Sequence, residues 1–264
     1  MCIYMKKVLV IGAHSYIGQK FKEYISEMNI KNIAVDLVSA SDGSWSQVDF
    51  SLYDTVMHLS GIVHKKERKS MESLYFNVNH KLAVEVAKKA KEKNVKQFIF
   101  MSTAAVFGTY ESCITKETIP NPTTYYGKSK FAAEQEIMIL QDDMFHIAIV
   151  RPPMVYGKNC KGNYARLIKL AKYTPVFPKI HNKRSMLNIN NLSKYLLQLI
   201  LHEKKGFFHP QDNEFADTCE LIIKLREEMG KKTILISIFN PLIKILCRYI
   251  NELNKLFGNF YYKF

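Results

Sequence analysis

The sequence predicts an α/β protein in which a doubly wound parallel sheet is followed by a smaller C-terminal lobe. Short β-branched runs alternate with helical patterns over residues 6–150, which is typical of parallel strands joined by helices. A glycine-containing turn, GAHSYIG, directly follows the first of these runs. Beyond Arg151 the alternation gives way to loops and Pro-punctuated segments, which indicates a second and less regular unit.

The strands are predicted from their β-branched, apolar runs, and a loop follows each of them. The predicted strands are KKVLVIG (6–12), NIAVDLVS (32–39), DTVMHLSG (54–61), QFIFMST (97–103) and HIAIVRP (146–152). Helices are expected after most of them. The longest is expected over 73–94, where apolar residues recur at helical spacing and Asn94 provides a stop.

Residues 152–264 are predicted to form a small substrate-binding lobe over the carboxyl edge of the sheet, where open α/β sheets bind ligands. Helices are expected over 164–173 and about 190–203. In DTCE, Asp217 as N-cap and Glu220 three residues later form a capping box. This pattern predicts a helix that extends to about Gly230.

The basic, aromatic C-terminal stretch that begins at Pro241 has two interpretations. It is either a helix for a membrane surface or a partner, or an element packed on the lobe. The second is favoured, and peripheral membrane contact stays open as the alternative.

Charge and cysteine usage limit the class of protein. The chain has 264 residues and a formal net charge of +14, which favours an anionic partner such as nucleotide phosphates, nucleic acid or an acidic membrane surface. No nucleic-acid-binding module is recognisable, so nucleic acid is not expected. The five cysteines show no CxxC or CxxH pairing, which indicates neither a metal site nor disulfides. Reduced thiols and the lack of a long apolar run predict a cytoplasmic protein without a transmembrane segment.

The turn GAHSYIG has the context of a dinucleotide-binding turn, because it lies between a strand and a helix. Gly12 would allow the tight turn. Gly18 would let the helix pack on the strand while its amino end, with Tyr16 and Ile17, faces a pyrophosphate. Ser15 stands where a third glycine is usual, and its side chain narrows the phosphate's approach. Residues 1–151 are therefore predicted to be an NAD(P)-binding, Rossmann-type domain.

An acid that binds the cofactor's ribose is expected about 20 residues beyond the turn. Asp36 is the candidate. If the second strand runs on to Ser39, then Ser39 and Ser41 face the ribose instead. No Arg or Lys occurs over 34–45 to bind a 2'-phosphate, so NAD is favoured and NADP is the alternative.

Three side chains are predicted to be catalytic: Thr103 at the tip of the fourth strand, and Tyr126 and Lys130 in YYGKSK. Positions i and i+4 share a helix face. Removing a hydride from an alcohol also requires removal of its proton, and a tyrosine with a pKa near 10 is a poor base at neutral pH. A neighbouring ammonium would lower that pKa. Thr103 would bind the substrate oxygen, and Lys130 would also contact the nicotinamide ribose.

The motifs GAHSYIG, HLSGIVH, FIFMSTAAVFG, YYGKSK and VRPPMVYG, in this order and spacing, resemble the extended short-chain dehydrogenase/reductase family. The likeness is to its NAD-dependent nucleotide-sugar epimerase/dehydratase branch, and it covers residues 6 to about 203. The resemblance implies an NAD cofactor, a UDP-sugar substrate and a homodimer formed through two helices that flank the active site.

The resemblance also implies further binding residues, and it leaves a few polar residues with other roles. Asn163 has a second interpretation as a helix N-cap, and the two roles can coexist. His58 and His64 are interpreted as structural. The implied cofactor contacts are Asp49, Phe50, Leu59, Ser60, Gly61, Ser102, Pro152 and Val155, and the implied substrate contacts are Thr103, Ala104, Asn163 and Arg184.

One departure from the family narrows the expected reaction. Its dehydratases carry an Asp-Glu pair where this chain has Ala104 and Ala105, so dehydration is not expected. The favoured function is a UDP-hexose or UDP-N-acetylhexosamine 4-epimerase of surface polysaccharide biosynthesis. An NAD(P)H-dependent UDP-4-keto-sugar reductase is the alternative. A non-catalytic dinucleotide-binding scaffold or sensor is the alternative of another class.

Overall fold

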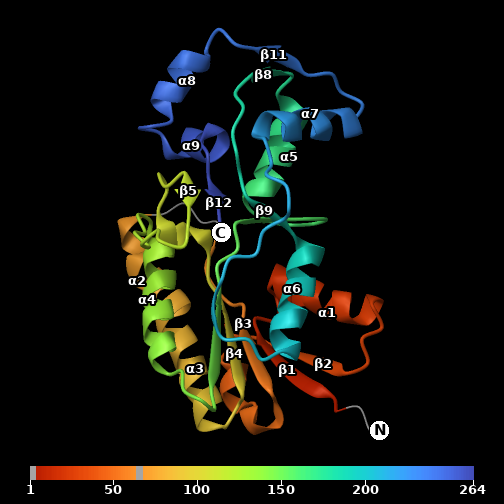
Figure 1. The fold of residues 1–264 in the computed structure, drawn as a ribbon, viewed down its shortest axis with the longest axis vertical. Coiled ribbons are helices and arrows are strands. Elements are labelled where there is room, and N and C mark those ends of the chain that lie inside the picture. The colour runs from red at the N-terminus through yellow and green to blue at the C-terminus, as the bar shows by residue number, and fades with distance from the viewer. Residues whose placement is uncertain (1–3, 64–67) are drawn as a thin grey trace.

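The computed structural model describes residues 4–63 and 68–264. At its centre lies a sheet flanked by helices (Figure 1). Its six strands are in the order β10-β6-β4-β3-β1-β2, and every pairing is parallel. Its strands are β1 (Lys6–Ile11), β2 (Ile33–Val38), β3 (Thr55–His58), β4 (Gln97–Met101), β6 (His146–Val150) and β10 (Gly206–Phe208). The strands predicted from the sequence are confirmed, and β10 is an addition.

The strand order is that of a Rossmann-type sheet that lacks the strand beyond β2, so β2 forms one edge of the sheet. From β1 the chain moves outward to β2 and then crosses back to β3 on the other side of β1, so the order reverses between β1 and β3 as in doubly wound sheets. Residues 39–54 form only two short 3-10 turns, η1 (Ser44–Gln47) and η2 (Phe50–Leu52). The predicted fold class is confirmed.

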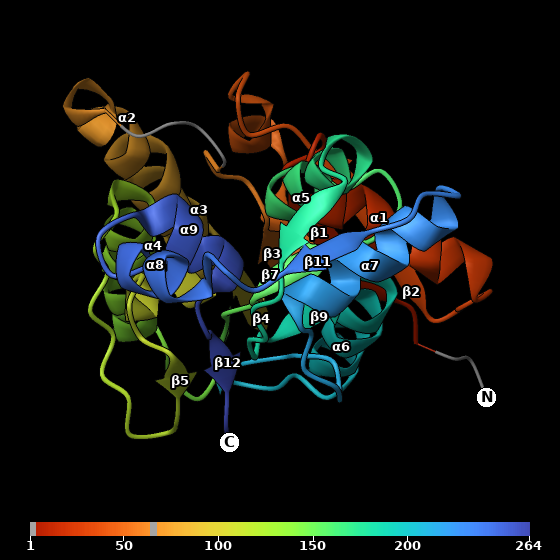
Figure 2. The same cartoon turned by 90° about the horizontal axis from the view of Figure 1, so that it is seen from above.

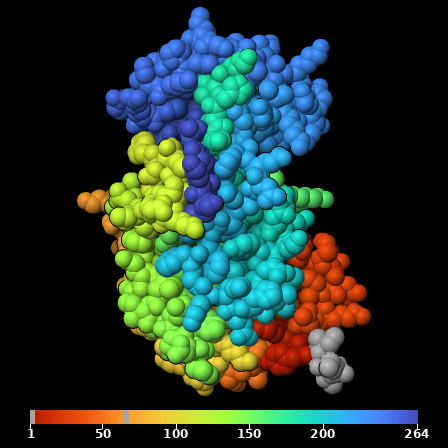
Figure 3. Space-filling model, in the orientation of Figure 1, coloured from red at the N-terminus to blue at the C-terminus, as the bar shows by residue number. Residues whose placement is uncertain are grey.

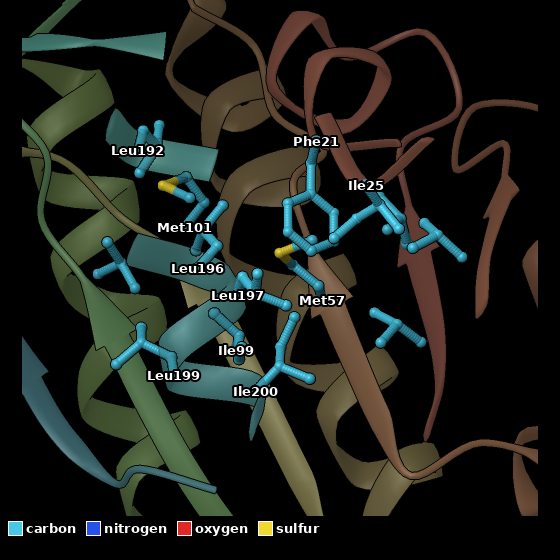
Figure 4. Close-up of a cluster of buried hydrophobic side chains, with 14 of the residues drawn as sticks. Phe21, Ile25, Met57, Ile99, Met101, Leu192, Leu196, Leu197, Leu199 and Ile200 are labelled. Carbon is cyan, nitrogen blue, oxygen red and sulfur yellow. The ribbon is translucent and has the colours of Figure 1, made fainter. Parts of the chain in front are cut away.

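Helices cover both faces of the sheet. On one face α1 (Tyr16–Glu27) and α6 (Ile189–Leu201) pack on alternate strand residues such as Met57 and Ile99 (Figure 4). On the other face α3 (Leu82–Glu92) and α4 (Tyr125–Ile139) pack on the intervening residues, such as Phe98. A strand buried on both faces needs apolar residues at every position, which explains its continuous apolar sequence.

The helix predicted over 73–94 is interrupted. It consists of α2 (Glu72–Phe76), a π-helical turn η4 (Asn77–Lys81) and α3. Asn79, inside this turn, stands at a position where the helical spacing predicts an apolar core residue. It is polar, and it is nevertheless fully buried. Single π turns within helices occur frequently at functional sites, and Asn79 reappears in the site below.

The small lobe covers the carboxyl ends of the strands (Figure 1, Figure 2). Leu167, Phe177, Ile222 and Phe257 belong to its own apolar core. Its helices are α5 (Asn163–Tyr173), α7 (Thr218–Glu228), α8 (Asn240–Leu246) and α9 (Asn251–Phe257). Three short parallel pairs accompany them: β7 (Met154–Tyr156) with β9 (Met186–Asn188), β8 (Val176–Pro178) with β11 (Ile234–Ile236), and β5 (Cys113–Ile114) with β12 (Tyr261–Tyr262).

The division of the chain at residue 151 is not a clean division in space. Between the lobe segments the chain returns to the sheet, where α6 covers one face and β10 pairs with β6. The C-terminal residues then run back between the lobe and the sheet domain, as Figure 3 shows in dark blue. Tyr262 is 1% exposed there, and its hydroxyl donates to the Arg151 carbonyl at 2.7 Å.

The N-cap at the start of α7 is confirmed, because the Asp217 carboxylate accepts from the Glu220 N–H at 3.1 Å. Within the described residues, no helix combines the length and apolar character that crossing a bilayer requires. The four cysteines in that part of the chain are free thiols.

Candidate active site at the carboxyl edge of the sheet

The turn after β1 and the loop after β3 meet at the carboxyl edge. Gly12 has φ +128°, a conformation that favours glycine. A Cβ at Gly12 would lie 3.1 Å from the Ser60 nitrogen, and a Cβ at Gly61 would lie 3.3 Å from Lys130 Nζ. The turn after β1 and the loop after β3 thus approach each other closely at Gly12, and Lys130 reaches the same loop at Gly61, which suits a cofactor bound against the backbone.

The amino end of α1 is a suitable pyrophosphate site. The first-turn N–H groups of Tyr16 and Ile17 have no intrahelical acceptor, and the helix dipole favours an anion there. Ser15 is the N-cap, and its hydroxyl accepts from the Gly18 N–H at 2.9 Å. The sequence predicts that the Ser15 side chain narrows the approach of the phosphate. In the structure the serine instead engages the Gly18 N–H, which a phosphate could otherwise bind.

The structure separates the two alternatives for the ribose position. Asp36 lies opposite Leu9 within β2, before the strand ends at Val38, and its carboxylate accepts from the Tyr53 hydroxyl at 3.0 Å. Ser39 is the first residue beyond the strand, and its hydroxyl lies 3.2 Å from that of Ser41. The carboxyl edge is thus occupied by the two serines rather than by Asp36.

The assignment of Asp49 and Phe50 to the cofactor site is wrong. Lys89, in the last turn of α3, donates to the Val48 carbonyl at 2.9 Å and lies 4.6 Å above the Phe50 ring. Since β4 starts directly after α3, this is the amino edge of the sheet. Phe50 is fully buried, and Asp49 caps η2, where hydrogen bonds from Ser51 lower the pKa of its carboxyl. The chain between β2 and β3 is too short for another strand and helix that would bring it to the opposite edge.

Thr103 and Tyr126 are brought together. Thr103 caps the 3-10 turn η5 (Ala104–Phe107), and its hydroxyl oxygen accepts from the Ala105 N–H at 3.1 Å. Tyr126 lies in the first turn of α4, half-buried, and is hydrogen-bonded to Thr103. Since the Thr103 oxygen accepts from Ala105, its own hydroxyl proton is still free to be donated to the phenol. Two of the three residues that the sequence predicts to be catalytic therefore lie within hydrogen-bond distance of each other.

Lys130 lies one turn further along α4 and is 3% exposed. Its ammonium donates to the Met101 carbonyl at 2.9 Å and lies 4.5 Å above the Phe100 ring. Burial lowers the pKa of Lys130 to about 7, and the Glu134 carboxylate acts in the opposite direction. The lysine is thus held under the tips of β3 and β4, beside Gly61.

The expected lowering of the Tyr126 pKa by Lys130 is not met in this structure. Burial raises the pKa of Tyr126 to about 12, the bond from Thr103 lowers it, and the nearby Tyr75 raises it. Burial dominates because it removes water from the charged phenolate. Tyr126 is therefore a neutral proton donor at neutral pH, and a phenolate forms only with additional stabilisation.

The hydroxyl of Ser102, a predicted cofactor contact, makes its hydrogen bond within the protein. It bonds to the Glu134 carboxylate, which also accepts from Arg151 Nε at 3.0 Å and Nη2 at 2.7 Å. All three residues are buried, and the Arg151 guanidinium lies between the Phe107 and Phe207 rings. This network ties the ends of β4 and β6 to α4 directly beneath Thr103 and Lys130.

Asn79 is a site residue that sequence reasoning missed. Its side chain accepts from the Ile62 N–H at 2.7 Å and donates to the Ile62 carbonyl and the Ser129 hydroxyl, both at 3.2 Å. It therefore fixes the loop after β3 to α4. The sequence did contain a sign of this role, because Asn79 is a polar residue at an apolar position of the predicted helix.

Gly127, between the two predicted catalytic residues of α4, was also missed. A Cβ there would lie 2.7 Å from the Ala105 carbonyl oxygen. Only a glycine lets the first turn of α4 approach η5 this closely, and the approach sets the distance between Tyr126 and Thr103.

His58 ends β3 and is fully buried against Phe100 at 6.0 Å between ring centres. Among the described residues, neither ring nitrogen has a hydrogen-bond partner, and burial lowers its pKa to about 3, with Lys130 contributing. It is neutral at any working pH. His64 lies outside the described residues.

The remaining predicted cofactor residues surround the same edge. Leu59 follows β3, and its N–H donates to the Ile11 carbonyl at 2.9 Å. Ala104 is buried, and its N–H donates to the Pro152 carbonyl at 3.0 Å. Val155 lies in β7, packed against the sheet's core. The backbone at these positions forms the rim of the site.

Asn163 and Arg184 lie together in a cavity of about 280 Å³ between the lobe helices and β9. The N-cap of α5 is Gly162, and Asn163 is its first helical residue, so the N-cap interpretation of Asn163 is wrong. Arg184 Nη1 donates to the Gly258 carbonyl at 2.9 Å, and burial lowers its pKa to about 10. The guanidinium therefore stays charged at neutral pH, and its other N–H groups remain available for an anion.

Comparison with known proteins agrees with this geometry. The model of the NAD dependent epimerase/dehydratase family matches residues 8–202. The chain belongs to this family. As a member of the NAD dependent epimerase/dehydratase family it is an NAD-dependent enzyme of the epimerase and reductase type, and NAD, when bound, supplies hydride-transfer chemistry.

Relatives in the family are sugar-modifying enzymes. The chain is 32% identical over 253 residues to UDP-glucose 4-epimerase of Vibrio cholerae, covering 86% of this chain and 77% of that one. It is 25% identical to N-acetyl-alpha-D-glucosaminyl-diphospho-ditrans,octacis-undecaprenol 4-epimerase of Escherichia coli O157:H7, with 85% and 73% covered. A dTDP-4-dehydrorhamnose reductase from Bacillus anthracis, solved in complex with NADP, has the same fold, with a TM-score of 0.72, 20% identity, and 89% and 85% covered.

In the part of the chain that the structure describes, no group of three or more His, Cys, Asp or Glu side chains is arranged to bind a metal ion. The donors that the site does offer are hydroxyls, backbone N–H groups, one lysine and one arginine. Such a set suits an anionic dinucleotide and a hydroxylated substrate.

Proposed function

We propose that the protein is a 4-epimerase of a UDP-linked hexose or N-acetylhexosamine, with NAD as its resident cofactor. The observation that carries this proposal is the Thr103–Tyr126 hydroxyl couple, set beside Lys130 at the edge where the glycine turn lies. The 4-epimerase activities that the names of the Vibrio cholerae and Escherichia coli relatives state support the position of the reacting carbon.

Tyr126 acts as the base in this reaction. It accepts the proton of the sugar's 4-hydroxyl, while Thr103 binds the same oxygen. A hydride leaves the same carbon, and the product is a 4-keto sugar. If the sugar then turns over in the site, hydride returns to its opposite face and Tyr126 gives its proton back. With the resident NAD as the acceptor of the hydride and later its source, the atoms and electrons balance without any further reactant.

The phenol needs help for this step, since its pKa lies near 12. Thr103 donates to the phenol oxygen and so stabilises the phenolate. A protonated Lys130 adds a positive charge from the same helix face. Because the pKa of Lys130 lies near 7, that charge is lost as the pH rises above neutrality.

The cavity in the lobe is the proposed site for the substrate's diphosphate. Arg184 supplies a half-buried positive charge, and Asn163 supplies an amide from the start of α5. A guanidinium matches phosphate oxygens in geometry and charge. Leu167, Leu170 and Leu221 provide apolar walls in the same cavity, which suits the nucleoside part.

Reduction of a 4-keto sugar is the second candidate. The same residues perform it, with Tyr126 donating a proton to the carbonyl oxygen. The difference is that the dinucleotide must leave after each turnover, whereas an epimerase keeps it. Ala104 and Ala105, in place of an acid pair, offer no carboxylate for eliminating water.

The test is to incubate purified protein with UDP-glucose, and separately with UDP-N-acetylglucosamine, without added dinucleotide. The 4-epimer is detected by proton NMR, and the nucleotide released on denaturation is identified by mass. Epimer formation with retained NAD supports the proposal. No epimer, together with oxidation of added NADPH by a UDP-4-keto sugar, establishes the reductase. Dinucleotide binding without either activity leaves the scaffold alternative, and a protein that binds no dinucleotide at all contradicts all three functions.

A further inference from the structure

The far end of the small lobe carries an exposed apolar surface around α8. Ile238 is 81% exposed and Tyr249 is 78% exposed, although both side chains are large and apolar or aromatic. The surface lies at the end of the molecule opposite the N-terminus (Figure 1, Figure 3). We call it the α8 face, and it consists of Ile234, Ile238, Phe239, Leu242, Ile245 and Tyr249.

The short helix α8 is apolar on both sides. Ile243 and Cys247 turn inward to the lobe core, and Leu242 and Ile245 are 55% and 56% exposed on the outside. A helix packed only on its own lobe needs an apolar stripe on one side. The outer stripe is therefore surplus to folding, and large exposed apolar patches mark interaction sites.

The charged residues within the segment that carries the α8 face, residues 229–251, are all of one sign. Residues 229–251 contain no Asp or Glu, and their charged residues are Lys231, Lys232, Lys244 and Arg248. All four are exposed, and none forms an ion pair within the described residues. The partner of this surface must therefore be apolar at its centre and anionic around it.

We propose that the α8 face docks on the surface of an anionic lipid bilayer. Side chains such as Ile238 and Phe239 would enter the boundary between headgroups and acyl chains, while Lys244 and Arg248 contact lipid phosphates. This pairing of apolar insertion with basic residues is the mode by which interfacial helices bind membranes.

A second copy of the chain fits this surface less well. Docking two α8 faces would place two groups of four uncompensated cations against each other, and like charges at an interface oppose association. The overall charge of +14 adds to that repulsion.

Docking would also place the substrate cavity beside the membrane. Glu252, Lys255 and Leu256 of α9 line the cavity, and α9 begins directly after the face ends. A helix of this length spans roughly 10 Å, so the cavity would lie near the headgroup layer. The proposal does not depend on the proposed reaction, because lipid binding is measured without substrate.

The test is cosedimentation of the full-length protein with vesicles of phosphatidylcholine alone or of phosphatidylcholine mixed with phosphatidylglycerol. We expect binding to the anionic vesicles only, weakening as salt screens the charges. The double variant Lys244→Ser/Arg248→Ser should bind about 25-fold more weakly, at about fivefold per charge. Ile238→Ser/Tyr249→Ser should lose roughly tenfold or more.

Matched controls come from α4 on the sheet domain. Ile139 is 80% exposed and Lys128 is exposed as well, so Ile139→Ser and Lys128→Ser should bind vesicles like the wild type. Circular dichroism establishes that each variant is folded, and the surface positions of all of them make unfolding unexpected.

Wild-type protein that stays in the supernatant with anionic vesicles overturns the proposal. Equal losses in the α8-face variants and the α4 controls also overturn it, because binding would then be nonspecific. Self-association that light scattering detects in the wild type and not in Ile238→Ser/Tyr249→Ser, without vesicle binding, would assign the face to a second copy instead.

Discussion

Arg151 and Glu134 form a buried bidentate ion pair one helical turn beyond Lys130, with bonds of 3.0 and 2.7 Å. The arginine follows β6, and the glutamate lies in α4. The Glu134 carboxylate also accepts from Ser102 and acts on Lys130, whose pKa it raises. One carboxylate thus sets both the position of the strand tip that carries Thr103 and the charge of the proposed catalytic lysine.

Glu134→Gln should lower the free energy of unfolding by about 3–5 kcal/mol, because it leaves the Arg151 charge buried without its partner. Urea unfolding measures this. Glu136→Gln is the matched control, since Glu136 lies on the same helix with its side chain 52% exposed, and a loss within about 1 kcal/mol is expected there. Similar losses of unfolding free energy in the two variants would show that the buried Arg151–Glu134 pair stabilises the fold no more than an exposed carboxylate does.

Tyr126→Phe should lower turnover by about 10²- to 10⁴-fold, the usual contribution of a positioned acid or base. Binding of the dinucleotide should change little, because the phenyl ring retains the packing. Isothermal titration and an epimer assay separate the two effects. Tyr173→Phe, at a 67% exposed position on α5, is the control that should change neither. Turnover near the wild-type rate would exclude Tyr126 as the base.

The hydroxyl couple could be predicted from the sequence, because it depends on local rules. A buried strand places Thr103 at its carboxyl end, and residues i and i+4 of a helix share a face, so the strand end and the Tyr126–Lys130 pair can converge at one edge of the sheet. The buried network beneath them also left a signal. Glu134 falls four residues beyond Lys130, and Arg151 directly follows an apolar strand, both at positions where apolar residues are usual.

The position of Asp49 could not be predicted from the sequence, because it depends on which edge of the sheet the chain between β2 and β3 lies against. In a longer connection a further strand would bring it to the carboxyl edge. Here Lys89 donates to the carbonyls of residues 45, 46 and 48 at the other edge, and nothing in the local sequence VDF indicates that contact. Likewise β10 is three residues long, too short for periodicity to distinguish it from a loop.

Lys130 should make stability depend on pH. Its pKa is about 7 in the folded protein against an ordinary 10.5. Between about pH 7 and pH 10 the unfolded chain therefore holds a proton that the folded chain lacks, and the free energy of unfolding should rise by about 1.4 kcal/mol per pH unit. Below about pH 7 the lysine is protonated in both states, and its contribution stays constant.

Comparing Lys130→Met with the wild type isolates this effect, because other titrating groups cancel in the difference. Urea unfolding at a series of pH values from about 7 to about 9 should show the rise in the wild type and its loss in the variant. Lys128→Met, at an exposed position of the same helix, should keep the wild-type slope. Parallel curves for Lys130→Met and the wild type would contradict a depressed pKa.

Gly127→Ala should be destabilising, although alanine at an exposed helix position is favoured over glycine by about 1 kcal/mol. The added Cβ would lie 2.7 Å from the Ala105 carbonyl oxygen and 3.1 Å from Pro122, so α4 must move away from η5. Overpacking of this kind costs about 1–3 kcal/mol. This cost exceeds the helix-propensity gain of alanine, so the net effect on the free energy of unfolding is a loss. Thermal unfolding checks it, with Gln135→Ala on the exposed side of α4 as the control. A stabilised Gly127→Ala would show that η5 yields easily.

Ser15 should trade helix stability against cofactor affinity, because its hydroxyl holds the Gly18 N–H at 2.9 Å. Ser15→Gly releases that N–H to a bound phosphate at a cost of only a few tenths of a kcal/mol, since glycine is an acceptable N-cap. A regained hydrogen bond of about 1 kcal/mol corresponds to roughly fivefold tighter NAD binding.

Ser15→Ala is the matched variant for this prediction. It releases the same N–H but loses the cap, so its free energy of unfolding should fall by about 1 kcal/mol while NAD binding tightens as in Ser15→Gly. Affinity and stability then move in opposite directions in one protein, which fluorescence titration with NAD and urea unfolding detect separately. If both variants bind NAD more weakly, the serine hydroxyl itself is a ligand of the phosphate rather than its competitor.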